Sequence, residues 1–328
     1  MKAIIPVAGF GTRLRPHTHT QPKALMHVAG KPIVAHIIDE LAEVGVDEVV
    51  LVVGYLGEKI ESYAREHYTN VKLHFVVQDE PLGNGHAVYV AREHLDGAPV
   101  IVIFGDTIIK GDIPGLLRSR ESLAGVKEVD DPRRLGVVEV DGQGYIRRFV
   151  EKPQEPPTNL ALIGVYHIRN STALGNALDR LVRENRQARG EFWLADGLQL
   201  MLEAGERMRT FTMEHWYDYG TPQALLQANH DLLDLAPPET ARGHDASVVV
   251  PPTYVSLSAE IHGSVVGPHV SIAEGARVVN SVIRDSIVNA YADVEDALLE
   301  HSIVGERAVV KGRPARVNVG ESSAIELT

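Results

Sequence analysis

The sequence AIIPVAGFGTRLRP, from Ala3 to Pro16, organises the interpretation of the whole chain. An apolar run of strand length leads into Gly9 and Gly11, and a hydroxyl residue and Arg13 follow at once. Glycine lacks a Cβ atom, so the backbone of such a loop can adopt positive φ angles and approach a ligand closely. Its successive N–H groups form a concave anion site, to which Arg13 and the downstream Lys23 add positive charge. The stretch therefore predicts a loop that binds a polyphosphate.

Two better-known glycine-rich loops do not fit this stretch. The dinucleotide-binding fingerprint needs a third glycine and an immediate helix, whereas Pro16 and Pro22 predict a long loop here. The phosphate loop of the common NTPases needs Gly-Lys followed by Ser or Thr, which is missing. A bare Gly-x-Gly pair is also typical of an ordinary tight turn. The pair becomes specific through the Thr-Arg-Leu-x-Pro that continues it and the Pro-Lys that follows downstream.

The composition is that of a globular protein, with 44% hydrophobic and 23% charged residues in a chain of 328. This length predicts a large core and two domains. The net charge of −12 argues against general nucleic-acid binding, which needs a basic surface. The lack of cysteine excludes disulfides and thiolate zinc sites. Without a signal-peptide pattern or an apolar run of membrane-spanning length, we expect a cytoplasmic protein that binds no membrane.

Strand and helix patterns alternate along the first part of the chain. We expect strands over 48–53, 71–77 and 99–104, and helices over 31–45, 58–68 and 86–95. This alternation predicts a doubly wound parallel sheet. Ligands bind such sheets outside the carboxyl ends of the strands. The Gly9 loop, Gln78 and Asp106 each follow a strand, so we expect them to share one rim.

The pattern changes further along the chain. We expect a β-hairpin over 135–150, a strand over 163–168, helices over 172–184, 194–204 and 221–233, and a linker at 237–243. A hexapeptide pattern follows, with a small or aliphatic residue at Val270, Ala276, Val282, Val288 and Val294. This spacing is typical of a parallel β-helix in which each rung stacks on the next. An antiparallel β-sandwich is the alternative.

The first loop resembles the signature of the sugar-1-phosphate nucleotidyltransferases, with Ala8-Gly9-x-Gly11-Thr12-Arg13-Leu14-x-Pro16 followed by Pro22-Lys23. Among these enzymes the chain is most similar to the long form of glucose-1-phosphate thymidylyltransferase. The resemblance implies a Rossmann-like, doubly wound mixed sheet in a nucleotidyltransferase domain over 1–235. It also implies a linker over 236–244 and a left-handed parallel β-helix over 245–328.

In the reaction of this family, a phosphate oxygen of a sugar 1-phosphate attacks the α-phosphorus of a nucleoside triphosphate, and pyrophosphate leaves in line. Both reactants are anions, so the protein must supply positioning and positive charge. Asp106 ends an apolar strand, where a lone carboxylate is costly and a magnesium ion would compensate it. The amide of Gln78 can pair with the imide edge of uracil or thymine.

The resemblance implies a role for each remaining site residue. Arg13, Lys23 and Lys152 are the expected catalytic cations, of which Arg13 and Lys23 touch the triphosphate and Lys152 holds the sugar phosphate. The expected nucleotide-binding residues are Ala8, Gly9, Gly11, Thr12, Gln78 and Gly83. The expected sugar-phosphate residues are Gly136, Glu151, Lys152, Asn159 and Tyr166. The expected ligands of Mg²⁺ are Asp106 and Asp218, the latter in Trp216-Tyr217-Asp218-Tyr219-Gly220-Thr221.

Several departures from the family pattern leave the substrates open. The triplet Lys23-Ala24-Leu25 is closer to uridylyl- and guanylyl-transferring relatives, whereas the stretch from Glu151 to Ala161 is closer to thymidylyltransferases. We expect dTTP or UTP with glucose 1-phosphate, and a homo-oligomer built through the β-helix. The alternatives are a UDP-N-acetylglucosamine or GDP-mannose pyrophosphorylase, a non-catalytic regulatory subunit of the same fold, and an enzyme with acetyltransferase activity in its repeats.

Overall fold

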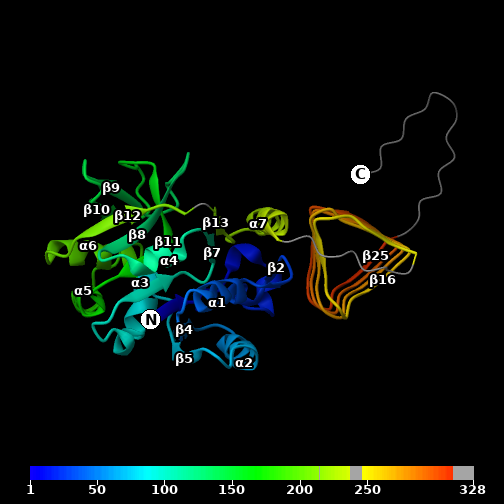
Figure 1. Cartoon of the computed structure of the whole chain (residues 1–328), viewed down its shortest axis with the longest axis horizontal. Coiled ribbons are helices and arrows are strands. Elements are labelled where there is room, and N and C mark those ends of the chain that lie inside the picture. Colours follow the sequence, from blue (N-terminus) through cyan, green and yellow to red (C-terminus); the bar gives the residue numbers. More distant parts are fainter. Residues whose placement is uncertain (214, 237–245, 313–328) are drawn as a thin grey trace. The chain divides into compact units, whose positions relative to one another are not determined.

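A computed structural model of the chain describes residues 1–213, 215–236 and 246–312. It separates into two compact units, one formed by 1–26 and 31–225 and the other by 27–30 and 226–328 (Figure 1). The predicted linker, 236–244, lies outside the described residues except for Ala236. The domain boundaries at 235 and 245 therefore stay predictions.

Four parallel strands form one half of the main sheet of the first unit. The strands β1 (Lys2–Pro6), β4 (Glu48–Val53), β5 (Lys72–Val77) and β6 (Val100–Ile103) lie in the order β6-β1-β4-β5. In β1, Ala3, Ile4 and Ile5 have no exposed surface. Strands covered on both faces are apolar without alternation, which is why this run could be recognised in the sequence.

The other half of the sheet is mostly antiparallel, with one parallel pair at its edge. Strand β11 (Leu160–Ile168) pairs antiparallel with β6, and the hairpin of β9 (Val137–Val140) and β10 (Ile146–Val150) continues from it. Strand β8 (Ser122–Glu128) also pairs with β11, and β12 (Met208–Phe211) pairs with β8. The predicted mixed α/β sheet is confirmed, although β8 and β12 were not expected.

Seven α-helices lie in the described part of the chain. They are α1 (Ile33–Glu43), α2 (Gly57–His67), α3 (Asn84–Val90), α4 (Ile113–Arg118), α5 (Ser171–Arg183), α6 (Leu194–Glu203) and α7 (Pro222–Leu235). One core joins α3, α5 and α6 to the sheet and contains Ile4, Val50 and Val102. The helix expected over 86–95 is wrong as one element, because a 3-10 turn, η4 (Arg92–His94), follows α3.

Short strands were also missed near the rim. The expected helix over 31–45 begins only at Ile33, because Lys31–Pro32 forms β3, which pairs with β2 (His27–Val28). Strand β7 (Thr107–Lys110) pairs antiparallel with β13 (His215–Asp218). Elements of two to four residues leave too little periodicity for detection in a sequence.

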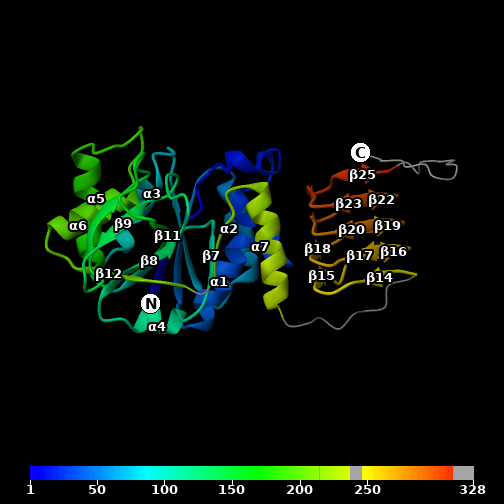
Figure 2. The ribbon, with the colours of Figure 1, turned by 90° about the horizontal axis from the view of Figure 1, so that it is seen from above.

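The second unit contains a stack of parallel strands in three sheets (Figure 2). The first sheet holds β14 (Val248–Val249), β17 (Val265–Val266), β20 (Val282–Arg284) and β23 (Leu298–Glu300). The second holds β15 (Thr253–Val255), β18 (Val270–Ile272), β21 (Ile287–Val288) and β24 (Ile303–Val304). The third holds β16 (Glu260–His262), β19 (Arg277–Val279), β22 (Asp293–Glu295) and β25 (Val309–Lys311).

This arrangement is consistent with the predicted left-handed β-helix, and its parallel pairing excludes the antiparallel sandwich. The coils trace a triangle when viewed along their stack (Figure 1). Four of the five recurring small or aliphatic residues, Val270, Ala276, Val288 and Val294, are fully buried, whereas Val282 is 38% exposed and its neighbour Ile283 is buried. Paired residues of successive coils lie 17 or 16 positions apart, as in Val248↔Val265 and Val282↔Leu298. Three full hexads would need 18, so a strict six-residue count drifts out of register.

Candidate active site

The loop after β1 needs glycine at one position and leaves another open. Gly11 has a φ of +62°, and a Cβ atom there would lie 3.0 Å from Thr18 Cγ2 and 3.1 Å from Lys23 Cβ. A side chain at Gly11 would therefore be both strained and crowded. At Gly9 a Cβ atom would meet nothing within 4 Å, so this backbone is open to a ligand. Short 3-10 turns, η1 (Thr12–Leu14) and η3 (Lys23–Leu25), follow the loop in place of a long helix.

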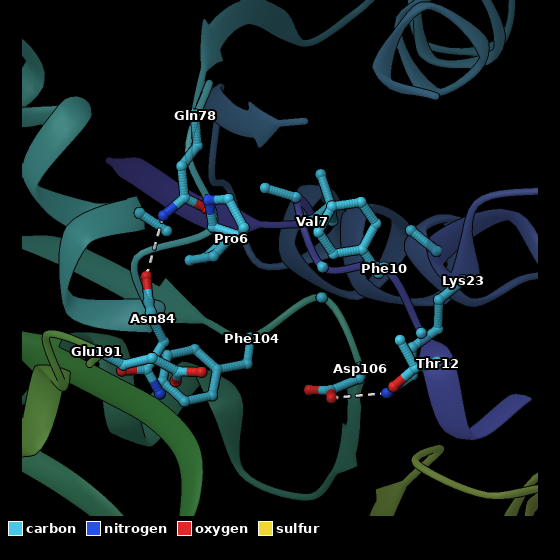
Figure 3. A pocket seen from close by; sticks show the side chains of 18 residues that line it. Pro6, Val7, Phe10, Thr12, Lys23, Gln78, Asn84, Phe104, Asp106 and Glu191 are labelled. Carbon is cyan, nitrogen blue, oxygen red and sulfur yellow. Dashed lines mark hydrogen bonds and ion pairs between the residues drawn. The ribbon is translucent and has the colours of Figure 1, made fainter. Parts of the chain in front are cut away.

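A cavity of about 380 Å³ lies beside this loop (Figure 3). Its volume falls within the range of small-molecule sites. Eight predicted site residues line it, namely Ala8, Gly9, Gly11, Thr12, Lys23, Gln78, Gly83 and Asp106. The expectation that the Gly9 loop, Gln78 and Asp106 share one rim is confirmed. The lining also includes Asn84, Phe104 and Glu191, which the sequence analysis did not identify.

Lys23 and Asp106 form an ion pair within this cavity. Lys23 Nζ donates to Asp106 Oδ2 at 2.7 Å (Figure 3). Loss of water around Asp106 would raise the pKa of its carboxyl, but the charge and hydrogen bond of Lys23 outweigh this effect. The pKa consequently lies below its ordinary value, with a smaller contribution from Arg13. Asp106 is thus an ionised carboxylate in the cavity wall.

Arg13 and the strand that carries Asp218 also lie near Asp106. The guanidinium of Arg13 packs against Gly220, where a Cβ atom would lie 2.6 Å from Nη2. In the β7–β13 pair, the backbone of Asp218 lies opposite Thr107, and Tyr219 N–H donates to Asp106 O at 3.3 Å. The side chain of Asp218 lies outside the described part of the structure.

The predicted base-binding turn is held from inside by Gln78. This side chain is 7% exposed, and its Nε2 donates to Gly83 O at 3.0 Å and lies 3.1 Å from His86 Nδ1. The spacing of five residues between Gln78 and Gly83 therefore corresponds to a real contact. The side-chain amide of Gln78 thus closes the turn and orders its backbone at the cavity wall.

Glu151 and Lys152 form the second predicted group. The Glu151 side chain is 12% exposed, and Lys152 Nζ lies 3.8 Å from Glu151 Oε1. Burial raises the pKa of Glu151 to about 7; Lys152 opposes this shift, whereas Asp196 and Glu191 add to it. A Cβ atom at Gly136 would lie 2.7 Å from Glu151 Oε2, so glycine makes room for this carboxyl.

Tyr166 and Asn159 differ in their relation to this group. Tyr166 is 2% exposed, and its ring centroid lies 5.8 Å from that of Phe104 in the cavity wall. Burial, with a smaller effect of Glu151, raises the pKa of the Tyr166 hydroxyl. Asn159 is exposed, and its carbonyl accepts a hydrogen bond from Val129 N–H. Of the contacts between described side chains, none joins Asn159 to Glu151 or Lys152.

The segment before α6 was missed by the sequence analysis. Glu191 lines the cavity, and the ammonium of Lys152 lies over the ring of Trp193 with 3.7 Å between Nζ and the ring centroid. Asp196 adds to the raised pKa of Glu151. These residues occupy a turn and the start of a helix, where acidic and aromatic side chains commonly have structural roles. Their connection to Lys152 depends on the tertiary fold.

In the described residues, no helix has the length and apolar character needed to cross a bilayer. The cytoplasmic location stays a prediction.

The comparisons with known sequences agree on one family. The family described as "Nucleotidyl transferase" matches residues 2–234. Across its whole length the chain is 33% identical to the low-salt glycan biosynthesis nucleotidyltransferase Agl11 of Haloferax volcanii, which it covers completely. A glucose-1-phosphate thymidylyltransferase of Streptomyces antibioticus is 28% identical over 100% of this chain and 99% of that protein. The bifunctional protein GlmU of Methanococcus maripaludis is 36% identical over 71% of this chain and 55% of that protein.

A solved structure shares the fold. The crystal structure of a UDP-glucose pyrophosphorylase complexed with UDP-glucose superposes with a TM-score of 0.62 at 23% identity, covering 72% of this chain and 99% of that one. This likeness concerns the architecture alone. The sequence matches extend over most or all of the chain, and the predicted resemblance is thereby confirmed. The chain belongs to the sugar-1-phosphate nucleotidyltransferase family and is a nucleotidyltransferase enzyme that acts on a sugar phosphate.

Proposed function

We propose that this chain transfers a nucleotidyl group from dTTP or UTP to glucose 1-phosphate in a magnesium-dependent reaction that releases pyrophosphate. One observation carries the proposal. The cavity joins the open backbone of Gly9, the Gln78–Gly83 turn and the ionised Asp106 in a single wall. One bound nucleotide would use all three features: the Gly9 backbone for its triphosphate, the Gln78–Gly83 turn for its pyrimidine base, and Asp106 for the metal ion that accompanies it.

The two anionic substrates would be bound by different cations of the site. We assign the triphosphate to the N–H groups of the Gly9–Thr12 loop, with Arg13 and Lys23 beside it, and the sugar phosphate to Lys152. The sugar would lie against Gly136, Glu151, Asn159 and Tyr166. Attack on the α-phosphorus needs little proton transfer, so alignment and charge neutralisation are the main contributions of the protein.

Asp106 fits a ligand of Mg²⁺, because its carboxylate is ionised and lines the cavity. Magnesium accepts one or two carboxylates together with phosphate oxygens and water. Asp218 is the proposed second ligand, supported by the pairing of its backbone with Thr107, the neighbour of Asp106. A bound Mg²⁺ would supply positive charge to the phosphate oxygens. Lys23 also compensates the charge of Asp106, through the ion pair between them.

The choice of glucose 1-phosphate and dTTP is supported by the full-length similarity to a glucose-1-phosphate thymidylyltransferase. UTP is retained because the sequence from Lys23 to Leu25 is closer to uridylyl-transferring relatives. The regulatory-subunit alternative is disfavoured by the full-length similarity to enzymes and by the presence of all five charged site residues. These are Arg13, Lys23, Asp106, Lys152 and Asp218.

We also propose that the β-helix joins two or more copies of this chain. Four apolar residues occupy paired positions on its first sheet and are exposed, namely Val248, Val265, Val282 and Leu298. Arg284 and Glu300 lie on the same sheet, with 3.3 Å between Nη2 and Oε1. An exposed apolar column beside charges of both signs is complementary to a second copy of itself, since each charge can face its opposite across a two-fold axis.

A pyrophosphate-release panel tests the reaction. Each of dTTP, UTP, GTP, CTP and ATP is combined with the 1-phosphates of glucose, mannose, N-acetylglucosamine and galactose. We expect the highest kcat/KM for dTTP or UTP with glucose 1-phosphate. A preference for N-acetylglucosamine 1-phosphate or for GTP with mannose 1-phosphate would replace this assignment with one of the two pyrophosphorylase alternatives. Acetyl-CoA with an amino sugar phosphate should release no CoA, which tests the acetyltransferase alternative.

A further inference from the structure

The segment Glu191–Leu194 is fastened to the predicted base-binding turn by three hydrogen bonds. Phe192 N–H donates to Leu82 O at 2.7 Å, and Gly85 N–H donates to Phe192 O at 2.9 Å. Leu194 N–H donates to Asn84 Oδ1 at 2.8 Å. These bonds join two stretches of chain that lie more than one hundred positions apart in the sequence. The segment therefore has a defined position relative to the turn.

Two glycines of the turn make this approach possible. A Cβ atom at Gly83 would lie 2.5 Å from Phe192 O, and one at Gly85 would lie 2.7 Å from the carbonyl carbon of Trp193. Real Cβ atoms essentially never come so close to backbone atoms. The turn that is predicted to contact the base thus packs directly against the backbone that carries Trp193.

Trp193 is itself held on two sides. It is 8% exposed, its Nε1 donates to Ala188 O at 3.1 Å, and it precedes the first residue of α6. The face of its indole ring lies under the ammonium of Lys152, with 3.7 Å between Nζ and the ring centroid. An aromatic face attracts a cation at this distance, and tryptophan does so most strongly.

The ammonium of Lys152 requires a contact that fixes its position. Its φ of +40° lies in the left-handed region, which non-glycine residues rarely occupy, and its side chain is 33% exposed. A lysine side chain has many rotamers, so an unsupported ammonium would be spread over many positions. The contact with Trp193 occupies one side of the ammonium, and Glu151 Oε1 lies 3.8 Å from Nζ. The N–H donors that neither contact uses can serve an anion.

We propose that Trp193 is a positioning residue that holds the Lys152 ammonium toward the sugar phosphate and ties it to the base-binding turn. This inference rests on the proposed function of Lys152. It assigns to Trp193 no contact with the reacting atoms. Its effect should consequently appear in the use of the sugar phosphate, while the nucleotide itself is bound normally.

The kinetic test compares Trp193→Leu, Trp193→Phe and the control Tyr145→Leu by pyrophosphate release. Tyr145 also lies under a cation, with 3.8 Å between its ring centroid and Arg207 Cζ, but outside the proposed site. Trp193→Leu should raise the KM for the sugar 1-phosphate about tenfold, with the KM for the nucleotide within about twofold. Trp193→Phe keeps an aromatic face and should raise it by about threefold. Tyr145→Leu should match the wild type.

Values equal to the wild type in both Trp193 variants would overturn the inference and leave the proposed function standing. If Trp193→Leu does not fold, Trp193→Phe decides by the same criterion. An equal loss for both substrates would also overturn it, because that result indicates a general structural role.

A spectroscopic test needs no substrate. A lysine ammonium against an indole ring quenches its fluorescence, so Lys152→Met should make the tryptophan emission brighter. The matched control is Lys127→Met, whose ammonium lies 5.8 Å from the ring centroid of Trp216, and a smaller change is expected there. Unchanged emission in Lys152→Met would overturn the contact. This measurement also decides the contact if no substrate pair releases pyrophosphate, in which case the proposed function fails separately.

Discussion

Replacing Glu151 by glutamine should stabilise the protein at pH 8 and have little effect at pH 5. The Glu151 side chain is 12% exposed, and burial raises its pKa to about 7 from an ordinary 4.5. A carboxyl whose pKa is higher in the folded state contributes stability below its unfolded pKa and loses that contribution as the pH rises through the folded value. Glutamine has nearly the same shape and never ionises, so the variant avoids the loss.

The magnitude follows from the difference between the two pKa values. A pKa of about 7 in place of 4.5 corresponds to on the order of 3 kcal/mol at pH 8 and less than about 1 kcal/mol at pH 5. For a unit of this size, about 3 kcal/mol corresponds to a rise in melting temperature of roughly 6–12 °C.

The assay is thermal unfolding of the wild type, Glu151→Gln and Glu155→Gln between pH 5 and pH 8. Glu155 is exposed in the same loop and serves as the matched control, for which we expect no pH-dependent gain. If Glu151→Gln melts at the wild-type temperature at pH 8, the carboxyl is not destabilised by burial. A gain of equal size at every pH would likewise refute the reasoning, because it would have a cause other than ionisation.

Three further predictions concern the loop, the metal ligand and the β-helix. Asp106→Asn should abolish pyrophosphate release and leave the circular dichroism spectrum unchanged; near-normal turnover with magnesium would remove Asp106 from the site. Gly11→Ala should cost about 1–2 kcal/mol of stability in thermal unfolding, because the backbone at Gly11 has a positive φ. Gly9→Ala should keep the wild-type melting temperature and raise the KM for the nucleotide. Equal melting temperatures for the two variants would contradict this contrast. The double variant Val282→Lys, Leu298→Lys should have a lower mass than the wild type in light scattering after size exclusion, and a monomeric wild type would contradict the proposed interface.

The rim of the sheet could be predicted from the sequence because its determinants are local. Three of the four strands of the parallel half, β1, β4 and β6, are mainly apolar runs, and the residue types that follow each strand are visible directly. Since parallel strands end at a common edge, Gly9, Gln78 and Asp106 had to lie near one another. The coil length of the β-helix was less accessible, because it depends on how many residues each corner uses. The exposure of Val282, which the other four recurring residues do not share, follows from that one unknown.

Contacts between loops could not be predicted in the same way. Trp193 reaches Lys152 only because Phe192 and Leu194 are bonded to the turn at Leu82 and Asn84. Each of these stretches looks ordinary by itself. The contact between Trp193 and Lys152 can be recognised only from distances in the folded structure, which a single sequence does not contain.

The pair of Lys23 and Asp106 shows how such a contact changes the chemical interpretation. The sequence analysis gave the two residues separate partners, the triphosphate for Lys23 and the metal for Asp106, and the structure joins them directly at 2.7 Å. In this arrangement each compensates the other, and Asp106 stays ionised where burial alone would favour its neutral form. A polyanion in the Gly9 loop would compete with Asp106 for Lys23. Because an ionised Asp106 left without Lys23 would face the phosphates as a like charge, that competition is favourable only when a cation accompanies the polyanion. We therefore expect the pair to favour a nucleotide that arrives with its metal over one that arrives alone.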